Sequence, residues 1–159
     1  MKELPDVMFG WTKSNDEIGG FSLEKHDTPT PGKGEVLIKT HSTSICGTDV
    51  HIWKWDDWAK ENVPLGTITG HETCGVIVAV GPGVSTHTIG DKVSIECHLA
   101  CWNCPRCDEG NAHICENGEI FGVHSNGAFA PFFTIPAINA RKLPSNLALE
   151  NASIQDPLG

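Results

Sequence analysis

Four of the seven cysteines stand close together in one short stretch, as Cys101, Cys104, Cys107 and Cys115. Zinc prefers soft donors at tetrahedral corners, and C-x2-C spacing lets successive thiolates turn toward one centre. Disulfide bonds with spare thiols are the alternative, but the odd total of seven cysteines and the lack of a secretory signal after Met1 argue against them. We predict one closed four-thiolate zinc site, which leaves no position for a substrate and has a structural role.

A second group of possible metal ligands is scattered along the chain, at the ends of predicted strands or the starts of predicted helices: Cys46, His71, Glu72 and Asp156. Each residue alone has an ordinary explanation, since a lone cysteine is usually a small core residue and a lone histidine usually lies on the surface. Together they offer a thiol, an imidazole and two carboxylates. The group therefore suggests a second metal site, where catalysis could occur.

The elements that must position these residues are mostly strands. Apolar, β-branched segments predict strands over 35–40, 75–80, 91–96 and 128–135, and Pro131 suits an edge strand. Turn residues predict hairpins within 1–34, while apolar spacing indicates short helical turns over 45–58 and a helix over 146–155. We expect a mainly β fold with short helices, arranged as a partly closed barrel that carries a zinc loop.

The composition restricts the possible partners. The 159 residues suit one domain, and the net charge is −9 with scattered basic residues. This pattern disfavours nucleic acid and anionic membranes as partners, and no apolar run approaches the roughly 20 residues of a membrane helix. We expect a soluble protein of a reducing compartment, the cytoplasm.

One run of residues has the spacing of a known zinc signature: Gly70-His71-Glu72-x2-Gly75-x5-Gly81-x2-Val84. With the cysteine loop that follows, the chain resembles the N-terminal GroES-like catalytic domain of zinc-containing medium-chain alcohol dehydrogenases, over residues 1–159. Within that family, segments 45–58 and 135–140 are most similar to threonine dehydrogenases. The family often has an acid and a tyrosine where Pro131 and Phe132 stand here.

The resemblance assigns roles to individual residues. It implies that Cys46 and His71 are catalytic zinc ligands, that Glu72 lies next to the metal or enters its coordination, and that Asp156 is a further ligand. Thr48 and His51 match the family's proton relay, although a helix cap and an exposed histidine are the ordinary alternatives.

Six further residues each have a specific interpretation. His98 matches a histidine near the substrate in threonine dehydrogenases, and the alternative is a surface histidine at a strand end. Cys74 and Cys97 are interpreted as buried thiols. Cys97 is also close enough in sequence to the four-cysteine loop to be an alternative zinc ligand. Trp53, Trp55 and Trp58 suit the core or an interface better than substrate contact.

The activity that the resemblance implies is NAD-dependent oxidation of the β-hydroxyl of L-threonine to 2-amino-3-oxobutanoate by a homo-oligomeric full-length enzyme. A polyol or sugar substrate, or a non-catalytic zinc-binding GroES-like module, are the alternatives. The sequence has no Gly-x-Gly-x-x-Gly turn between a strand and a helix. We therefore expect this chain to lack the Rossmann cofactor domain and to be inactive by itself.

Overall fold

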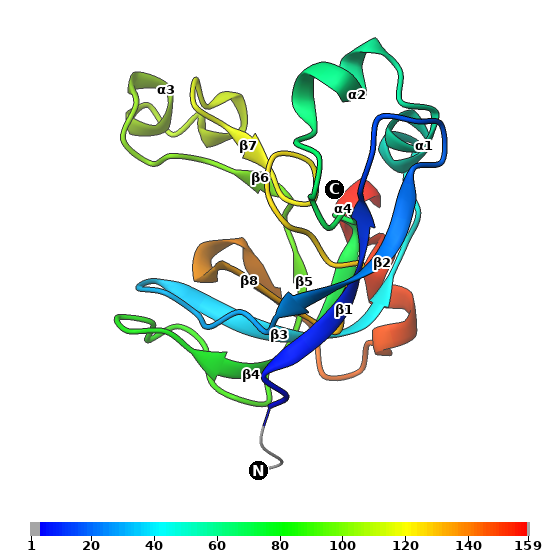
Figure 1. The fold of residues 1–159 in the computed structure, drawn as a ribbon. Coiled ribbons are helices and arrows are strands. Elements are labelled where there is room, and N and C mark those ends of the chain that lie inside the picture. The colour runs from blue at the N-terminus through cyan, green and yellow to red at the C-terminus, as the bar shows by residue number, and fades with distance from the viewer. Residues whose placement is uncertain (1–3, 159) are drawn as a thin grey trace.

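The computed structural model describes residues 4–158, and its strands form three antiparallel sheets (Figure 1). The strands are β1 (Val7–Lys13), β2 (Phe21–Asp27), β3 (Glu35–Thr43), β4 (Thr73–Val80), β5 (Lys92–Ile95), β6 (His98–Leu99), β7 (Glu119–Ile120), β8 (Phe132–Pro136) and β9 (Ala140–Lys142). The α-helices are α1 (Gly47–Lys54), α2 (Asp57–Asn62), α3 (Pro105–Asp108) and α4 (Gln155–Leu158), and the 3-10 helices are η1 (Ala112–Ile114), η2 (Ala137–Asn139) and η3 (Leu149–Ile154). No helix within residues 4–158 has the length and apolar character required to cross a membrane.

The five-stranded sheet, in the order β8-β3-β4-β5-β9, contains most of the core. The first half of strand β3 is buried on both of its faces. Val36 and Ile38 pack with Ile77 in the main core, while Leu37 points to the other face and packs with Met8 of the β1–β2 hairpin. Burial on both faces explains why Val36, Leu37 and Ile38 form a continuous apolar run, whereas the strand is polar from Lys39 onward.

The mainly β architecture and the expected strands are confirmed, including the hairpin within residues 1–34 and the edge position of β8. The expected closure is wrong, because the described sheets do not close into a barrel. Strands β8 and β9 each pair with one neighbour at opposite edges of the five-stranded sheet. The β1–β2 hairpin is a separate sheet. It meets the rest through the isolated bridge of Thr12 with Ile68 and through backbone hydrogen bonds such as that from the Trp11 N–H to the Phe129 carbonyl over 2.9 Å, but it adds no strand to the five-stranded sheet.

The short helical turns expected over 45–58 are present as helix α1 and the start of helix α2. Helix α1 begins after Cys46, whose backbone N–H donates to Asp49 Oδ2 over 2.8 Å. It ends where Trp55 turns into the left-handed region with φ 54°. Asp56 then caps α2, because its Oδ1 accepts a hydrogen bond from the Ala59 N–H over 3.0 Å. The two helices are therefore joined by a sharp turn, and the first of them begins directly after the candidate ligand Cys46.

The predicted helix over 146–155 is in part a different structure, since η3 precedes the short α4. This segment lies against strands β3 and β4. The buried Cys74 thiol donates to the carbonyl of Leu149 over 2.9 Å, and the Ser42 hydroxyl donates to the same carbonyl over 3.2 Å. Cys74 is therefore a packing residue, as predicted.

Three glycines bring two distant segments into backbone contact just ahead of His71. Gly70 has φ +91°, and a Cβ atom built on Gly127 or Gly122 would lie 2.3 or 2.4 Å from the Gly70 carbonyl oxygen. That oxygen accepts the Ala128 N–H over 2.8 Å. No side chain fits between these segments, so the segment 122–128 fixes the backbone that presents His71.

Candidate metal centres and catalytic residues

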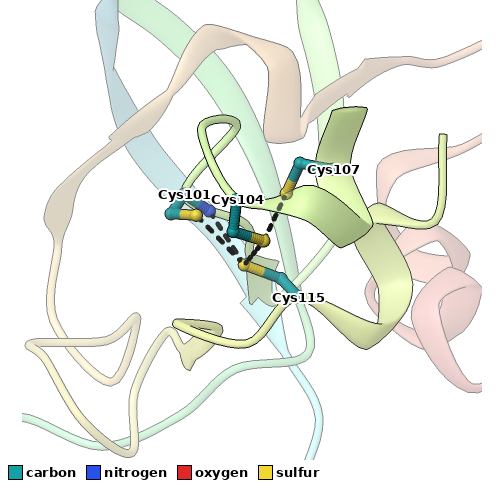
Figure 2. Close-up of side chains that lie close together, drawn as sticks. All are labelled: Cys101, Cys104, Cys107 and Cys115. Carbon is teal, nitrogen blue, oxygen red and sulfur yellow. Dashed lines mark hydrogen bonds between the residues drawn. The ribbon is translucent and has the colours of Figure 1, made fainter. Parts of the chain in front are cut away.

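The four-cysteine segment folds into a small lobe in which all four thiols converge (Figure 2). Cys115 Sγ lies 3.4 Å from Cys101 Sγ and 3.8 Å from Cys104 Sγ, and Cys104 Sγ lies 3.6 Å from Cys107 Sγ. Pro105 begins the short helix α3, which turns the chain between Cys104 and Cys107. All four are free cysteines, so the predicted grouping is present without disulfide bonds.

The electrostatics of this lobe favour a bound cation. Backbone N–H groups of Cys107 and Glu116 lower the pKa of Cys104 to about 6, whereas burial and its thiol neighbours raise the pKa of Cys107 to about 11. The Cys104 thiolate is thus stabilised. Ionisation of the neighbouring Cys107 thiol is disfavoured, because a second negative charge would lie within contact distance of the first. A divalent cation would let all four sulfurs ionise, and four sulfurs without an open position are the donor set of structural zinc.

The second predicted group also comes together. Cys46, His71 and Glu72 place their ligand atoms within 4.8 Å of one another, and His71 and Glu72 are buried. Cys46 comes from the start of α1, and the other two come from the segment that leads into β4. A thiol, an imidazole and a carboxylate are a donor set that zinc accepts, and three protein donors leave one position for a reactant.

A buried carboxylate beneath this group supports the assignment of His71 as a ligand. Asp49 Oδ1 lies 4.0 Å from His71 Nδ1, and neither atom has a hydrogen-bond partner. Burial raises the pKa of Asp49, although the Cys46 N–H bonded to its other oxygen opposes this effect. A carboxylate facing one nitrogen of an imidazole is the usual partner that orients a metal-binding histidine.

Asp156 lies in α4 and is not part of the Cys46 group. It lies beside Cys97 instead: burial raises the pKa of the Cys97 thiol, and the Asp156 carboxylate adds to the effect. Cys97 is buried, as predicted, and is grouped with Glu96 and His98 rather than with the four-cysteine lobe. The roles of Asp156 and Cys97 toward a metal remain predictions.

The two predicted relay residues lie on α1, next to the Cys46 group. The Thr48 hydroxyl lies 3.8 Å from Cys46 Sγ, and Thr48 and His51 line one cavity of about 500 Å³ together with Trp58. The His51 side chain is 59% exposed and contacts the carboxylate of Asp56 through its Nδ1. The cavity thus connects a hydroxyl beside the candidate ligand with an imidazole open to solvent.

His98 borders a different cavity, of about 220 Å³, near the cysteine lobe. Its Nδ1 lies 2.7 Å from Glu96 Oε1, and its backbone N–H donates to the same oxygen. Burial opposes the ionisation of Glu96, but these two hydrogen bonds outweigh it and lower the pKa of Glu96. The histidine is therefore held in place by a carboxylate, while its side chain remains 62% exposed.

Sequence reasoning missed the partners of the predicted residues. Asp49, Asp56 and Glu96 each face a histidine of the predicted set. A weak signal existed, since Asp56 lies five positions after His51 and Glu96 two before His98.

Of the tryptophans, Trp55 is buried as predicted, whereas Trp58 borders the His51 cavity and Trp53 a separate apolar one.

Residues 32–145 match the family described as "Alcohol dehydrogenase GroES-like domain". The chain belongs to this family. Among curated relatives, L-threonine 3-dehydrogenase of Pyrococcus furiosus is 45% identical over 156 residues, which cover 98% of this chain and 44% of that protein. The chain therefore spans less than half the length of this relative.

Solved structures agree with the family and the fold. A short chain alcohol dehydrogenase from E. coli CFT073 in complex with NADH superimposes with a TM-score of 0.85 at 31% identity, over 96% of this chain and 43% of that one. A cobalt- and zinc-bound thermostable alcohol dehydrogenase from Pyrobaculum aerophilum gives a TM-score of 0.82 at 28% identity, over 94% of this chain and 45% of that one. The mainly β domain is thus an alcohol dehydrogenase domain of the GroES-like type.

Proposed function

We propose that this chain is the catalytic domain of a zinc- and NAD-dependent dehydrogenase that oxidises the β-hydroxyl of L-threonine to 2-amino-3-oxobutanoate. The observation that carries the proposal is the Cys46, His71 and Glu72 group with the Thr48 hydroxyl beside it. A non-catalytic zinc-binding module would need the closed four-cysteine site alone. An additional three-donor group next to a hydroxyl and an exposed imidazole serves catalysis better.

Zinc held by Cys46 and His71, with Glu72 beside the metal or in its coordination and Asp156 as the predicted further ligand, would supply the Lewis acidity that makes a substrate hydroxyl easier to deprotonate. The protein's own residues then have two tasks. Thr48 accepts the hydroxyl proton while it donates its own onward, and His51, in the same cavity, delivers a proton to solvent. Removal of a proton and a hydride converts the secondary alcohol to a ketone, with the hydride going to a nicotinamide.

The likeness to a curated L-threonine 3-dehydrogenase favours L-threonine as the substrate. A polyol or sugar dehydrogenase is the near alternative, since the same metal donors would serve either reaction. An amino acid carries an ammonium and a carboxylate, so a pocket for it pairs both charges. A substrate without an ammonium or a carboxylate would leave the matching polar groups of the pocket unpaired. Discrimination between substrates on this basis can reach roughly 10⁴-fold.

The hydride acceptor is expected to bind outside the residues of this chain, since the sequence has no dinucleotide-binding turn. We therefore propose that the chain by itself does not oxidise L-threonine, because holding the two reactants together can be worth roughly 7–11 kcal/mol. All seven cysteines are free, which suits the reducing cytoplasm. We propose a homo-oligomer for the full-length enzyme, with no nucleic acid or membrane partner.

The decisive experiment compares His71→Gln with a matched interior control, Cys74→Ser, in the full-length enzyme. NADH formation is followed with L-threonine, sorbitol, glucose and ethanol. We expect the wild type and Cys74→Ser to prefer L-threonine in kcat/KM, and His71→Gln to lose activity on every substrate. A higher kcat/KM for a polyol or sugar would refute the threonine assignment alone. Full activity in His71→Gln would refute the catalytic metal site.

A further inference from the structure

Asp56 connects the two helices that border the relay cavity. Its Oδ1 accepts the Ala59 N–H over 3.0 Å and caps α2, while its Oδ2 contacts Nδ1 of His51 near the end of α1. A carboxylate bound at both oxygens is held in one orientation. The cap therefore sets the direction in which the second oxygen meets the imidazole.

The contact determines which nitrogen of His51 is available for chemistry. When Nδ1–H donates to a carboxylate, the neutral ring keeps its proton on Nδ1 and presents Nε2 as the acceptor. His51 needs such a restraint because its side chain is 59% exposed. Trp58 provides a second one, since its ring meets the imidazole edge-on with centroids 6.3 Å apart.

We infer that Asp56 is a positioning residue of the proton relay: it fixes the tautomer and orientation of His51 and stabilises the ring in its protonated form. The inference rests on the proposed function, because it concerns how His51 receives and releases the proton. Asp56 itself does not contact the reacting atoms. It acts through the imidazole, as a carboxylate does when it orients a general base.

The charges around the ring support this role. The hydrogen bond from His51, followed by the Ala59 N–H, lowers the pKa of Asp56, which favours the ionised carboxylate. Lys54 of α1 acts on Asp56 in the same direction. Asp57 of α2 also borders the cavity, but its side chain is 97% exposed and pairs with Lys60. Asp56 is thus the carboxylate in contact with the ring.

The experiment uses the full-length enzyme with Asp56→Asn, Asp56→Ser and the control Asp57→Asn. Asparagine and serine are good N-caps, so both Asp56 variants keep α2 while removing the charge. Asp57→Asn removes the same charge from the same cavity wall without touching His51. ¹⁵N-histidine NMR, assigned by the resonance lost in His51→Gln, reports the tautomer.

In both Asp56 variants we expect the His51 nitrogen resonances to change from one tautomer to a mixture. We expect kcat for L-threonine to fall by about 10²-fold, the lower end of what general acid–base catalysis contributes, with KM unchanged. The acidic limb of the kcat profile should move to lower pH, because loss of the anion disfavours the protonated ring. Asp57→Asn should keep the wild-type tautomer of His51, because Asp57 pairs with Lys60 and not with the ring.

Two results have opposite meanings. If Asp56→Asn and Asp56→Ser keep the wild-type tautomer and kcat while His51→Gln and Thr48→Ala lose activity, the relay stands and the role of Asp56 is overturned. If His51→Gln and Thr48→Ala keep full activity, the relay in the proposed function is itself wrong. Thermal melts of all variants separate these effects from loss of the α2 cap, because a lost cap would lower Tm without changing the tautomer.

Discussion

Asp49 Oδ1 and His71 Nδ1 lie 4.0 Å apart in the buried interior, and neither atom has a hydrogen-bond partner. The same aspartate also receives the Cys46 N–H through Oδ2. One carboxylate thus lies behind two candidate ligands of the same metal, the cysteine through its backbone and the histidine through its ring. The relationship makes Asp49 a determinant of how the donor group is held.

Asp49→Asn is expected to weaken metal binding at the Cys46 group by about 10- to 100-fold, the usual effect of removing the carboxylate behind a ligating histidine. The amide can still accept the Cys46 N–H, so the start of α1 should remain. Competition with a chelator, followed by elemental analysis, measures the affinity. Glu61→Gln, an exposed carboxylate on α2, is the control and should leave affinity unchanged. Equal affinity in both variants would contradict the role of Asp49.

Cys104→Ser is expected to destabilise the domain far more than Cys46→Ser. Cys104 lies between two other thiols of the closed site, and a closed site contributes folding free energy directly. We expect a loss of at least about 3 kcal/mol, or roughly 6–12 °C in Tm, against less than about 1 kcal/mol for Cys46→Ser. Equal shifts in thermal melts would show that the two sites do not differ in structural role.

His98→Ala in the full-length enzyme should reduce kcat/KM for L-threonine about 10-fold or more and affect an uncharged alcohol less. The reason is that Glu96 holds the imidazole at a defined place beside a small cavity. His113→Ala, which removes a second histidine from the same cavity wall, is the control. An equal loss on both substrates in His98→Ala would rule out a role in substrate choice.

Asp91→Asn tests a pH-dependent contribution to stability. The Lys142 ammonium lowers the pKa of Asp91, and the Thr88 N–H adds to the effect. A carboxyl group whose pKa is lowered on folding stabilises the fold when the pH is above its unfolded pKa of about 3.9. This stabilisation is lost as the pH falls through the folded pKa. The variant should be less stable by up to about 1 kcal/mol at pH 7, and this difference should disappear once the pH lies below the folded pKa of Asp91. A difference that persists in acid would exclude the ion pair as its cause.

Local spacing predicted much of the chemistry because several ligands lie close together in the chain. The four-cysteine loop and the adjacent His71 and Glu72 could be recognised in this way, and the apolar run of β3 made that strand evident. The proximity of Asp49 to His71 could not be predicted from the sequence, since it depends on how α1 packs against the segment ahead of β4.

Three structural features lacked a clear signal in the sequence. The division into α1 and α2 depends on Trp55 in a left-handed conformation, which tryptophan rarely adopts. Apolar spacing does not separate a 3-10 helix from an α-helix over a segment as short as η3. Closure depends on how β8 and β9 pair, and no local pattern specifies which edges meet.

The backbone contact between Gly70 and the segment 122–128 has a consequence for the order in which the metals are acquired during synthesis. A ribosome adds about 5–20 residues per second, so Cys46 and His71 emerge seconds before the glycines that hold Gly70 in place. All four thiols of the lobe emerge earlier than Gly122 and need no distant partner. The nascent chain should therefore bind its structural zinc first, and the catalytic site should form only after β8 has paired with β3.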